Sequence, residues 1–173
     1  MPTQKLTLTT TSLHNVVISN HSDVIYYEVV TPKWGRGTTR VSRLDPNARA
    51  FDVVGELRNE DDRPVAVRVY GGEFRPVDEF LQSAGEEAKT GRFRGKDGRA
   101  YVWVIKDRHL ELVREAAPDE KPLAVFHRHK RWLFVLRMSR HPYIEIDPSV
   151  LDTLDSLIIS FLLMERRRRH REK

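Results

Sequence analysis

Apolar and polar residues alternate with a period of two along most of the chain before residue 147, in short runs separated by turn-forming residues. The runs are rich in β-branched and aromatic residues, so each one predicts a β-strand. The predicted strands are Val24–Val30, Thr38–Leu44, Phe51–Arg58, Pro64–Tyr70, Glu73–Leu81, Arg92–Ile105 as a hairpin, His109–Val113, Leu123–His127, Trp132–Arg137 and Tyr143–Ile146. About ten strands at this spacing are typical of an all-β barrel or sandwich.

Details within these runs predict which side chains face the core. In the strand starting at residue 51, one face is expected to be buried and the other wet; the buried set is Phe51, Val53 and Leu57, and the wet set is Asp52, Glu56 and Arg58. Pro76 cannot donate a hydrogen bond to a ladder, so we expect it on an edge strand or at a bulge. Asp97–Gly98 predicts the turn of the clearest hairpin, in which Tyr101, Trp103 and Ile105 share a face.

The pattern changes at residue 147, where Asp147, Pro148 and Ser149 can begin a helix by capping and by a proline in the first turn. The predicted helix covers about 149–167, and past residue 156 it is apolar almost all round. Its apolar stretch is shorter than the roughly 20 residues that cross a bilayer. We therefore expect it to be buried inside the strands as a structural core; its inward residues are Leu154, Leu157, Ile158, Phe161 and Leu162.

The basic tail at 166–173 follows this helix, and its run Arg166–Arg169 has a structural explanation. Cations at a helix C-terminus complement the helix dipole. We expect the run to mark the point where the helix leaves the core, and to form a solvated face.

Length, charge and cysteine content limit the number of domains and the kinds of site that this chain can have. The chain has 173 residues, consistent with one domain over 1–173 with strands from about 5 to 147. Thirty basic and 25 acidic residues give a formal charge of +5, which permits contact with phosphates without requiring it. The absence of cysteine excludes disulfides and thiolate metal sites. No secretory signal is recognisable, so we expect a cytoplasmic protein, with a peripheral membrane or nuclear location as variants, and not a secreted one.

Four segments carry a family resemblance: "YYEVVTP" at 26–32, "RPVDEFL" at 75–81, "RFRGKDGRAYVWV" at 92–104 and "LDSLIISFLLMERRRR" at 154–169. They resemble an uncharacterised fungal domain-of-unknown-function family close to the superfamily of the tubby C-terminal domain, the LURP-one proteins and the phospholipid scramblases. The resemblance implies a closed antiparallel barrel of about twelve strands around a central helix. Tubby barrels bind phosphoinositide headgroups through basic residues of the outer face, but no matching motif carries those residues across, and a chain without cysteine departs from the scramblases.

Two basic hairpin tips are the candidate sites for an anionic ligand. The first contains Arg92, Arg94, Lys96 and Arg99, and the second contains Arg128, Lys130 and Arg131 beside Trp132. Guanidinium groups can hold phosphates by paired hydrogen bonds, whereas the alternative is that these charges only keep hairpin tips soluble. If both tips lay near Arg166–Arg169 they would form one patch suited to anionic lipid.

His127 and His129 are candidate metal ligands, because residues two apart on a strand point to one face. A third ligand would have to come from His141, Glu145 or Asp147.

No catalytic template is recognisable in the sequence. We therefore expect a non-catalytic module that binds an anionic phospholipid or phosphoinositide headgroup or a protein partner, with no cofactor. The alternative is an enzyme or metal-binding protein with a rim site near His127 and His129, and non-specific nucleic-acid binding is a third reading.

Overall fold

The computed structural model describes residues 2–83, 89–128 and 141–172. Its strands are β1 (Gln4–Leu8), β2 (Asn15–Ser19), β3 (Tyr26–Val30), β4 (Thr38–Asp45), β5 (Ala50–Glu60), β6 (Arg63–Val69), β7 (Arg75–Pro76), β8 (Thr90–Arg94), β9 (Ala100–Lys106), β10 (His109–Arg114), β11 (Ala124–His127) and β12 (Tyr143–Ile146). The helices are α1 (Val77–Phe80), the 3-10 helix η1 (Pro148–Thr153) and α2 (Leu154–Arg171). The predicted strand Trp132–Arg137 lies outside the described residues.

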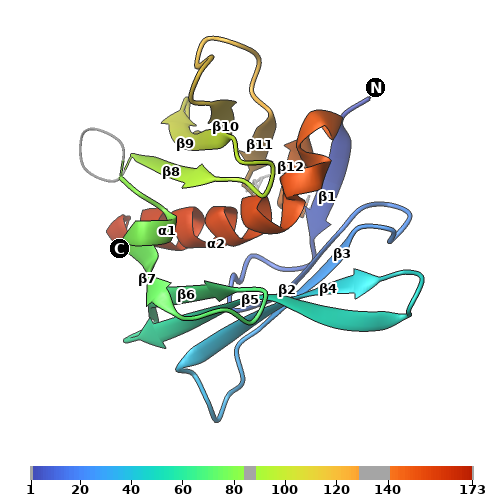
Figure 1. Ribbon diagram of the computed structural model, residues 1–173, viewed down its shortest axis with the longest axis vertical. Helices are drawn as coiled ribbons and strands as arrows, with labels where there is room; N and C mark the ends of the chain where they lie inside the picture. Colours follow the sequence, from blue (N-terminus) through green and yellow to red (C-terminus); the bar gives the residue numbers. More distant parts are fainter. Residues whose placement is uncertain (1, 84–88, 129–140, 173) are drawn as a thin grey trace, which may run out of the picture.

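All twelve strands form one sheet in the order β7-β6-β5-β4-β3-β2-β1-β12-β11-β10-β9-β8, and every pair is antiparallel. The sheet curves around α2, with β8 to β10 on one side of the helix and β4 to β6 on the other (Figure 1). The N-terminal strand β1 pairs with both β2 and β12, which joins the two halves of the sheet. The prediction of a mainly β fold around a C-terminal helix is confirmed.

Among the described residues, the predicted closure of the barrel is not present, because the two end strands β7 and β8 do not pair with each other. Pro76 ends β7 after two residues and has no N–H to continue a ladder, and the chain turns directly into α1. One antiparallel bridge between Gln82 and Arg92 then connects the segment after α1 to β8. The seam between the sheet edges is therefore spanned by a short helix and one bridge. The prediction that Pro76 lies on an edge strand is confirmed.

The concave side of the sheet is filled by α2. The five predicted core residues of the helix, Leu154, Leu157, Ile158, Phe161 and Leu162, are each exposed by 2% or less. The phenyl ring of Phe161 packs against Phe126 of β11 at a centroid distance of 4.7 Å. Large buried apolar side chains contribute about 2 kcal/mol each before entropy costs, so this helix supplies much of the hydrophobic stabilisation. Within the part of the chain that the structure describes, no helix is long and apolar enough to cross a membrane.

A polar contact inside this core fixes α2 against β9. The indole N–H of Trp103 donates to Oγ of Ser160 at 2.9 Å, and the Ser160 hydroxyl donates to the carbonyl oxygen of Leu157 at 2.9 Å. Trp103 and Ser160 are both fully buried. The helix begins as predicted from its cap, since the Asp147 side chain accepts a hydrogen bond from the Ser149 amide, but the first six residues form η1 and α2 runs on to Arg171.

A β-bulge overturns the predicted inward face of β5. The pairing with β4 shifts between Val41 and Ser42, which leaves Val54 without a partner in the ladder. Residues before the bulge therefore point to the opposite face from the one that strict alternation predicts. Leu57 is buried as expected, whereas Phe51 and Val53 are 45% and 40% exposed.

The predicted wet face of β5 is also wrong at Glu56, which is buried. Its carboxylate accepts a hydrogen bond from Arg68 and lies 3.8 Å from the Arg40 guanidinium. The long side chains of these arginines cover it, as amphipathic side chains commonly do.

A second polar cluster lies where α2 begins. The hydroxyls of Tyr27 and Tyr70 both donate to the carboxylate of Asp155, the second at 2.7 Å, and Arg43 lies 3.4 Å from the same carboxylate. Burial, followed by the charge of Asp155, raises the pKa of Tyr27 well above its ordinary value. Burial and the hydrogen bond to Asp155 raise the pKa of Tyr70 as well.

We expect Ser160→Ala to destabilise the fold by about 1–3 kcal/mol, because it leaves the buried indole N–H of Trp103 without an acceptor. Urea denaturation followed by fluorescence measures the free energy of unfolding. Ser156→Ala in the same helix is the control, since Ser156 makes no side-chain hydrogen bond within the described residues. Equal effects of the two substitutions would contradict the assigned role of the Trp103–Ser160 bond.

We expect the free energy of unfolding to fall as pH rises above about 10, the ordinary pKa of tyrosine. Tyr27 and Tyr70 keep their protons in the folded state at pH values where the unfolded chain loses them, so their contribution is complete below pH 10 and is lost at higher pH. Urea denaturation from pH 8 to 11.5 measures the slope. A double Tyr27→Phe and Tyr70→Phe variant should show a shallower decline, and an unchanged slope in that variant would contradict this origin.

Candidate functional site

Of the four predicted basic residues of the β8–β9 hairpin, Arg92 and Arg94 lie on β8 and Lys96 and Arg99 lie in the turn. Arg92 donates to Glu115 at 2.6 Å and to Gln82 at 3.1 Å, and Arg94 donates to the Gly98 carbonyl oxygen at 2.7 Å. Lys96 lies over the ring of Tyr70, and the Arg99 guanidinium is 4.0 Å from Asp97. These contacts provide partners for each cation, so the tip is not a set of unpaired charges.

This tip lies at the N-terminal end of α2. The Lys96 amide donates to Oγ1 of Thr153 at 2.9 Å, just before the helix begins. A Cβ atom at Gly95 would collide with Oγ1 of Thr153, so the close approach of the tip to the start of the helix requires glycine there.

The second predicted tip is represented by Arg128, because Lys130, Arg131 and Trp132 lie outside the described residues. Arg128 donates to Glu165 at 3.0 Å and to Glu172 at 2.7 Å, near the C-terminal end of α2. Twelve helical residues separate Thr153 from Glu165, which is roughly 18 Å along the axis. Among the described residues, Arg128 and the β8–β9 tip are therefore at opposite ends of the helix and do not share one patch.

The candidate metal ligand His127 is part of an aromatic stack on the outer face of the sheet. Its ring stacks on Tyr143 at 4.5 Å, meets the edge of His109 at 5.0 Å and lies 3.2 Å from Glu145 through Nε2. The other candidate, His129, lies outside the described residues. Across residues 2–83, 89–128 and 141–172, no group of three or more potential ligands could hold a metal ion.

The arginine run at the end of α2 differs from the expected solvated face. Arg166 is only 7% exposed and donates to the Leu13 carbonyl oxygen at 2.6 Å and to Asn59 at 3.2 Å. Burial lowers the pKa of Arg166 to about 10, which still leaves it charged at neutral pH. Arg168, also buried, donates to the Arg108 carbonyl oxygen at 2.8 Å. These two arginines fasten the end of the helix to the surrounding loops.

The buried carboxylate of Glu165 neutralises one side of this helix end. Arg128 and Arg169 donate to its Oε1 at 3.0 and 2.9 Å, and Arg168 lies 3.7 Å from Oε2. Glu172 adds a second negative charge to Arg128 and Arg168. Each of the three arginines on the β11 side of α2 therefore has a glutamate partner, and two negative charges offset most of their positive charge.

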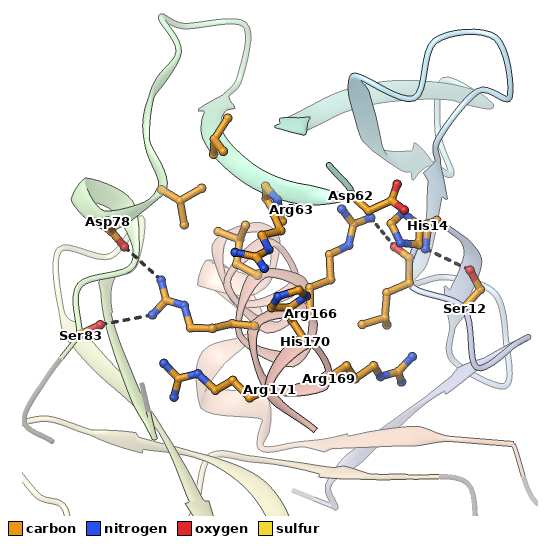
Figure 2. Close-up of a pocket in the computed structure, with 16 residues that line it drawn as sticks. Ser12, His14, Asp62, Arg63, Asp78, Ser83, Arg166, Arg169, His170 and Arg171 are labelled. Carbon is orange, nitrogen blue, oxygen red and sulfur yellow. Dashed lines mark hydrogen bonds and ion pairs between the residues drawn. The ribbon is translucent and has the colours of Figure 1, made fainter. Parts of the chain in front are cut away.

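A cavity of about 800 Å³ lies on the other side of the same helix end. Figure 2 shows Arg63 reaching from β6 toward His170, with Arg169 and Arg171 on the last turns of α2. Three chain segments form the remaining wall: the β1–β2 loop, the β5–β6 turn with the start of β6, and α1 with Ser83 beyond it. The lining residues are Ser12, Leu13, His14, Asp62, Arg63, Pro64, Val65, Val77, Asp78, Ser83, Leu163, Arg166, Arg167, Arg169, His170 and Arg171.

The cavity is positively charged. Five arginines and two aspartates line it, and one of these arginines, Arg169, is paired with Glu165. A formal excess of two positive charges remains with both histidines neutral. Arg167 donates to Asp78 at 3.2 Å and to Ser83 at 3.4 Å. Among the described residues, the side chains of Arg63 and His170 have no hydrogen-bond or ion-pair partner.

The pKa of Arg167 shows that holding these cations close together, partly out of water, is unfavourable. Burial lowers the pKa of its guanidinium, the charge of Asp78 opposes the shift and the charge of Arg171 adds to it. Cations held close together and partly removed from water favour the arrival of an anion, because the anion replaces lost hydration and reduces repulsion. The cavity can therefore bind an anionic group, and guanidinium groups suit the oxygens of phosphate.

Local structure explains why these side chains meet. Leu163, Arg167 and Arg171 are four residues apart on α2, so they share one helical face. The β5–β6 turn places Asp61 and Asp62 at positive φ, which brings Arg63 to the cavity at the start of β6. Sequence reasoning identified the arginine run but not its partners Arg63 and His14, because no local pattern connects segments so far apart.

Comparison with known proteins gives one match. No curated protein and no solved structure matches the chain. Residues 11–170 match the model of a family of unknown function, DUF6593, which covers β2 to β12, nearly all of α2 and every cavity-lining residue but Arg171. The chain therefore belongs to the DUF6593 family.

Proposed function

We propose that this protein is a non-catalytic binding module whose cavity at the C-terminal end of α2 holds a multiply charged, phosphate-bearing ligand. The observation that supports this function is the positive excess within the cavity, where Arg63, Arg167 and Arg171 come from two separate elements. Their guanidinium groups would contact the phosphate oxygens, and His170 would contribute a further polar contact at the same wall.

The helix dipole, which explains an arginine run at the end of α2, does not account for this cavity. Cations at the end of α2 complement the helix dipole, and that effect needs only residues of the helix itself. Arg63 belongs to β6 and makes no ion pair within the described residues, yet it lines the same space. On the opposite side, by contrast, Arg128 is paired with both Glu165 and Glu172.

The other predicted surfaces have less support. The cations of the β8–β9 hairpin are engaged by neighbours such as Glu115 and Asp97, and an enzyme or metal site near His127 gains no ligand cluster from the described residues. The resemblance to tubby-like domains fits a sheet wrapped around a helix, and we propose that relationship for the fold. The proposed binding surface, however, is a cavity at one end and not the outer face used by tubby barrels.

Binding of sodium triphosphate, measured by titration calorimetry, tests the proposal. We expect the double variant Arg63→Ala and Arg171→Ala to weaken binding roughly 10- to 30-fold, because each exposed guanidinium contact is worth about 1 kcal/mol. The matched control is the double variant Arg94→Ala and Arg99→Ala, which removes two arginines from the hairpin tip at the other end of α2. We expect this control to bind as wild type does.

Binding should also weaken as salt rises from 50 to 300 mM, since screening acts on a site that is partly open to water. Absence of triphosphate binding by the folded wild-type protein would overturn the proposal. An equal loss in both double variants would show that total charge, and not the cavity, is responsible, and would overturn it as well.

A further inference from the structure

The most exposed large apolar side chain of the described residues is Trp34, in the loop between β3 and β4. Its exposed fraction is 101%, so it touches almost nothing of its own protein. Tryptophan is usually largely buried, and its indole combines a large apolar ring with an N–H that requires a polar partner. A tryptophan in this setting suits an environment that offers both, such as the boundary between membrane and water.

The loop that carries Trp34 is fastened to the wall of the arginine-lined cavity at both of its ends. At the first end, Oγ1 of Thr31 donates to the carbonyl oxygen of His14, a lining residue, at 2.9 Å. At the second end, the Asn59 side chain donates to the Arg36 carbonyl oxygen at 3.1 Å and accepts from Arg166, another lining residue, at 3.2 Å.

Trp34 therefore projects from the same end of the molecule as the cavity. Figure 1 shows the β3–β4 loop extending away from the sheet at the bottom of the view. The loop has internal hydrogen bonds, from the Gly35 amide to the Pro32 carbonyl oxygen at 3.2 Å and from the Thr38 amide to the Gly35 carbonyl oxygen at 3.3 Å. These bonds reduce the number of bare backbone groups that a less polar environment would penalise.

Two cations flank the indole. Lys33 and Arg36 are exposed, and within the described residues their side chains have no ion-pair partner. Basic residues beside an anionic membrane surface contribute favourable energy, and tryptophan beside them anchors a protein at headgroup depth. Together with the cavity, this end of the protein carries one tryptophan, two loop cations and the positive charges of the pocket.

From this juxtaposition we infer that the cavity end is a membrane-docking surface. Trp34 inserts into the headgroup region of an anionic bilayer, Lys33 and Arg36 contact acidic lipids around it, and the cavity receives the phosphates of one lipid headgroup. The inference rests on the proposed function and names the source of its ligand as a membrane lipid and not a free phosphate compound.

The surroundings of Trp34 favour a bilayer over a protein partner. Stable protein interfaces have a central apolar cluster, whereas the other strongly exposed apolar residues are not gathered around this loop. Phe51 and Val53 lie where β4 meets β5 at the far end of that hairpin, because Leu44 pairs with Phe51. Val30, the last residue of β3, is the nearest along the chain. An isolated indole between two cations matches the chemistry of lipid headgroups.

Co-sedimentation with vesicles tests the inference, run beside triphosphate calorimetry on the same proteins. The vesicles contain phosphatidylcholine alone, phosphatidylcholine with phosphatidylserine, or both with phosphatidylinositol bisphosphate. We expect Trp34→Ala to reduce partition onto the third vesicle type at least tenfold, a loss of about 1.4 kcal/mol, and to leave the triphosphate affinity within about twofold of wild type. The double variant Arg63→Ala and Arg171→Ala should lose both activities. Phe51→Ala, an exposed aromatic residue at the far end of the β4–β5 hairpin, should lose neither.

The outcomes separate the inference from the proposed function. If wild type binds triphosphate but Trp34→Ala sediments with vesicles as wild type does, the membrane inference fails alone. It also fails if wild type binds triphosphate and no vesicle, in which case the ligand is free in solution and Trp34 serves another partner, such as a protein. If wild type does not bind triphosphate, the proposed function fails, and the membrane inference that rests on it is withdrawn too.

Discussion

Burial of α2 within the curved sheet is the interaction on which the rest of the structure depends. The helix is apolar on almost every side, so a sheet packed against one face would leave the other faces in water. Twelve antiparallel strands that wrap around it remove this exposure. The sheet does not have to close for this purpose. Where β7 ends at Pro76, α1 contributes Val77 and Phe80 to the core and covers the gap between the sheet edges.

Burial of the helix also determines the arrangement of charge at its end. The last turns of α2 remain within the sheet, so arginines that would otherwise be solvated are partly removed from water and need hydrogen-bond acceptors. Arg166 finds backbone and amide oxygens, and Arg168 finds a carbonyl oxygen and two carboxylates. On the β11 side, Glu165 and Glu172 provide carboxylate acceptors for the arginines. On the β6 side fewer carboxylates are present, and the arginines line a cavity. The proposed anion site follows from this unequal supply of negative charge.

The sequence predicted those features that depend on local patterns. Period-two runs identified nearly every described strand after residue 20, and the apolar segment after Ser149 identified the buried helix. The features that the sequence predicted wrongly or did not predict have physical causes. One unpaired residue, Val54, reversed the faces of β5, and alternation alone cannot show a bulge. The candidate basic tips were found as charge clusters, but partners such as Glu115 and Glu165 come from distant parts of the chain. The cavity combines segments that only the tertiary fold brings together.

The hydrogen bond between Trp103 and Ser160 has a consequence for the far end of the helix. A purely apolar helix in a purely apolar cylinder could settle at several angles about its own axis with similar packing energy. A single buried donor that must meet a single acceptor selects one angle. Since successive residues are about 100° apart, turning α2 by one residue would direct Arg167 and Arg171 away from β6. An indole and a hydroxyl that never reach solvent, two to three turns away, thus help to set the rotation at which the arginines face the cavity, together with the contacts of Asp155 and Arg166.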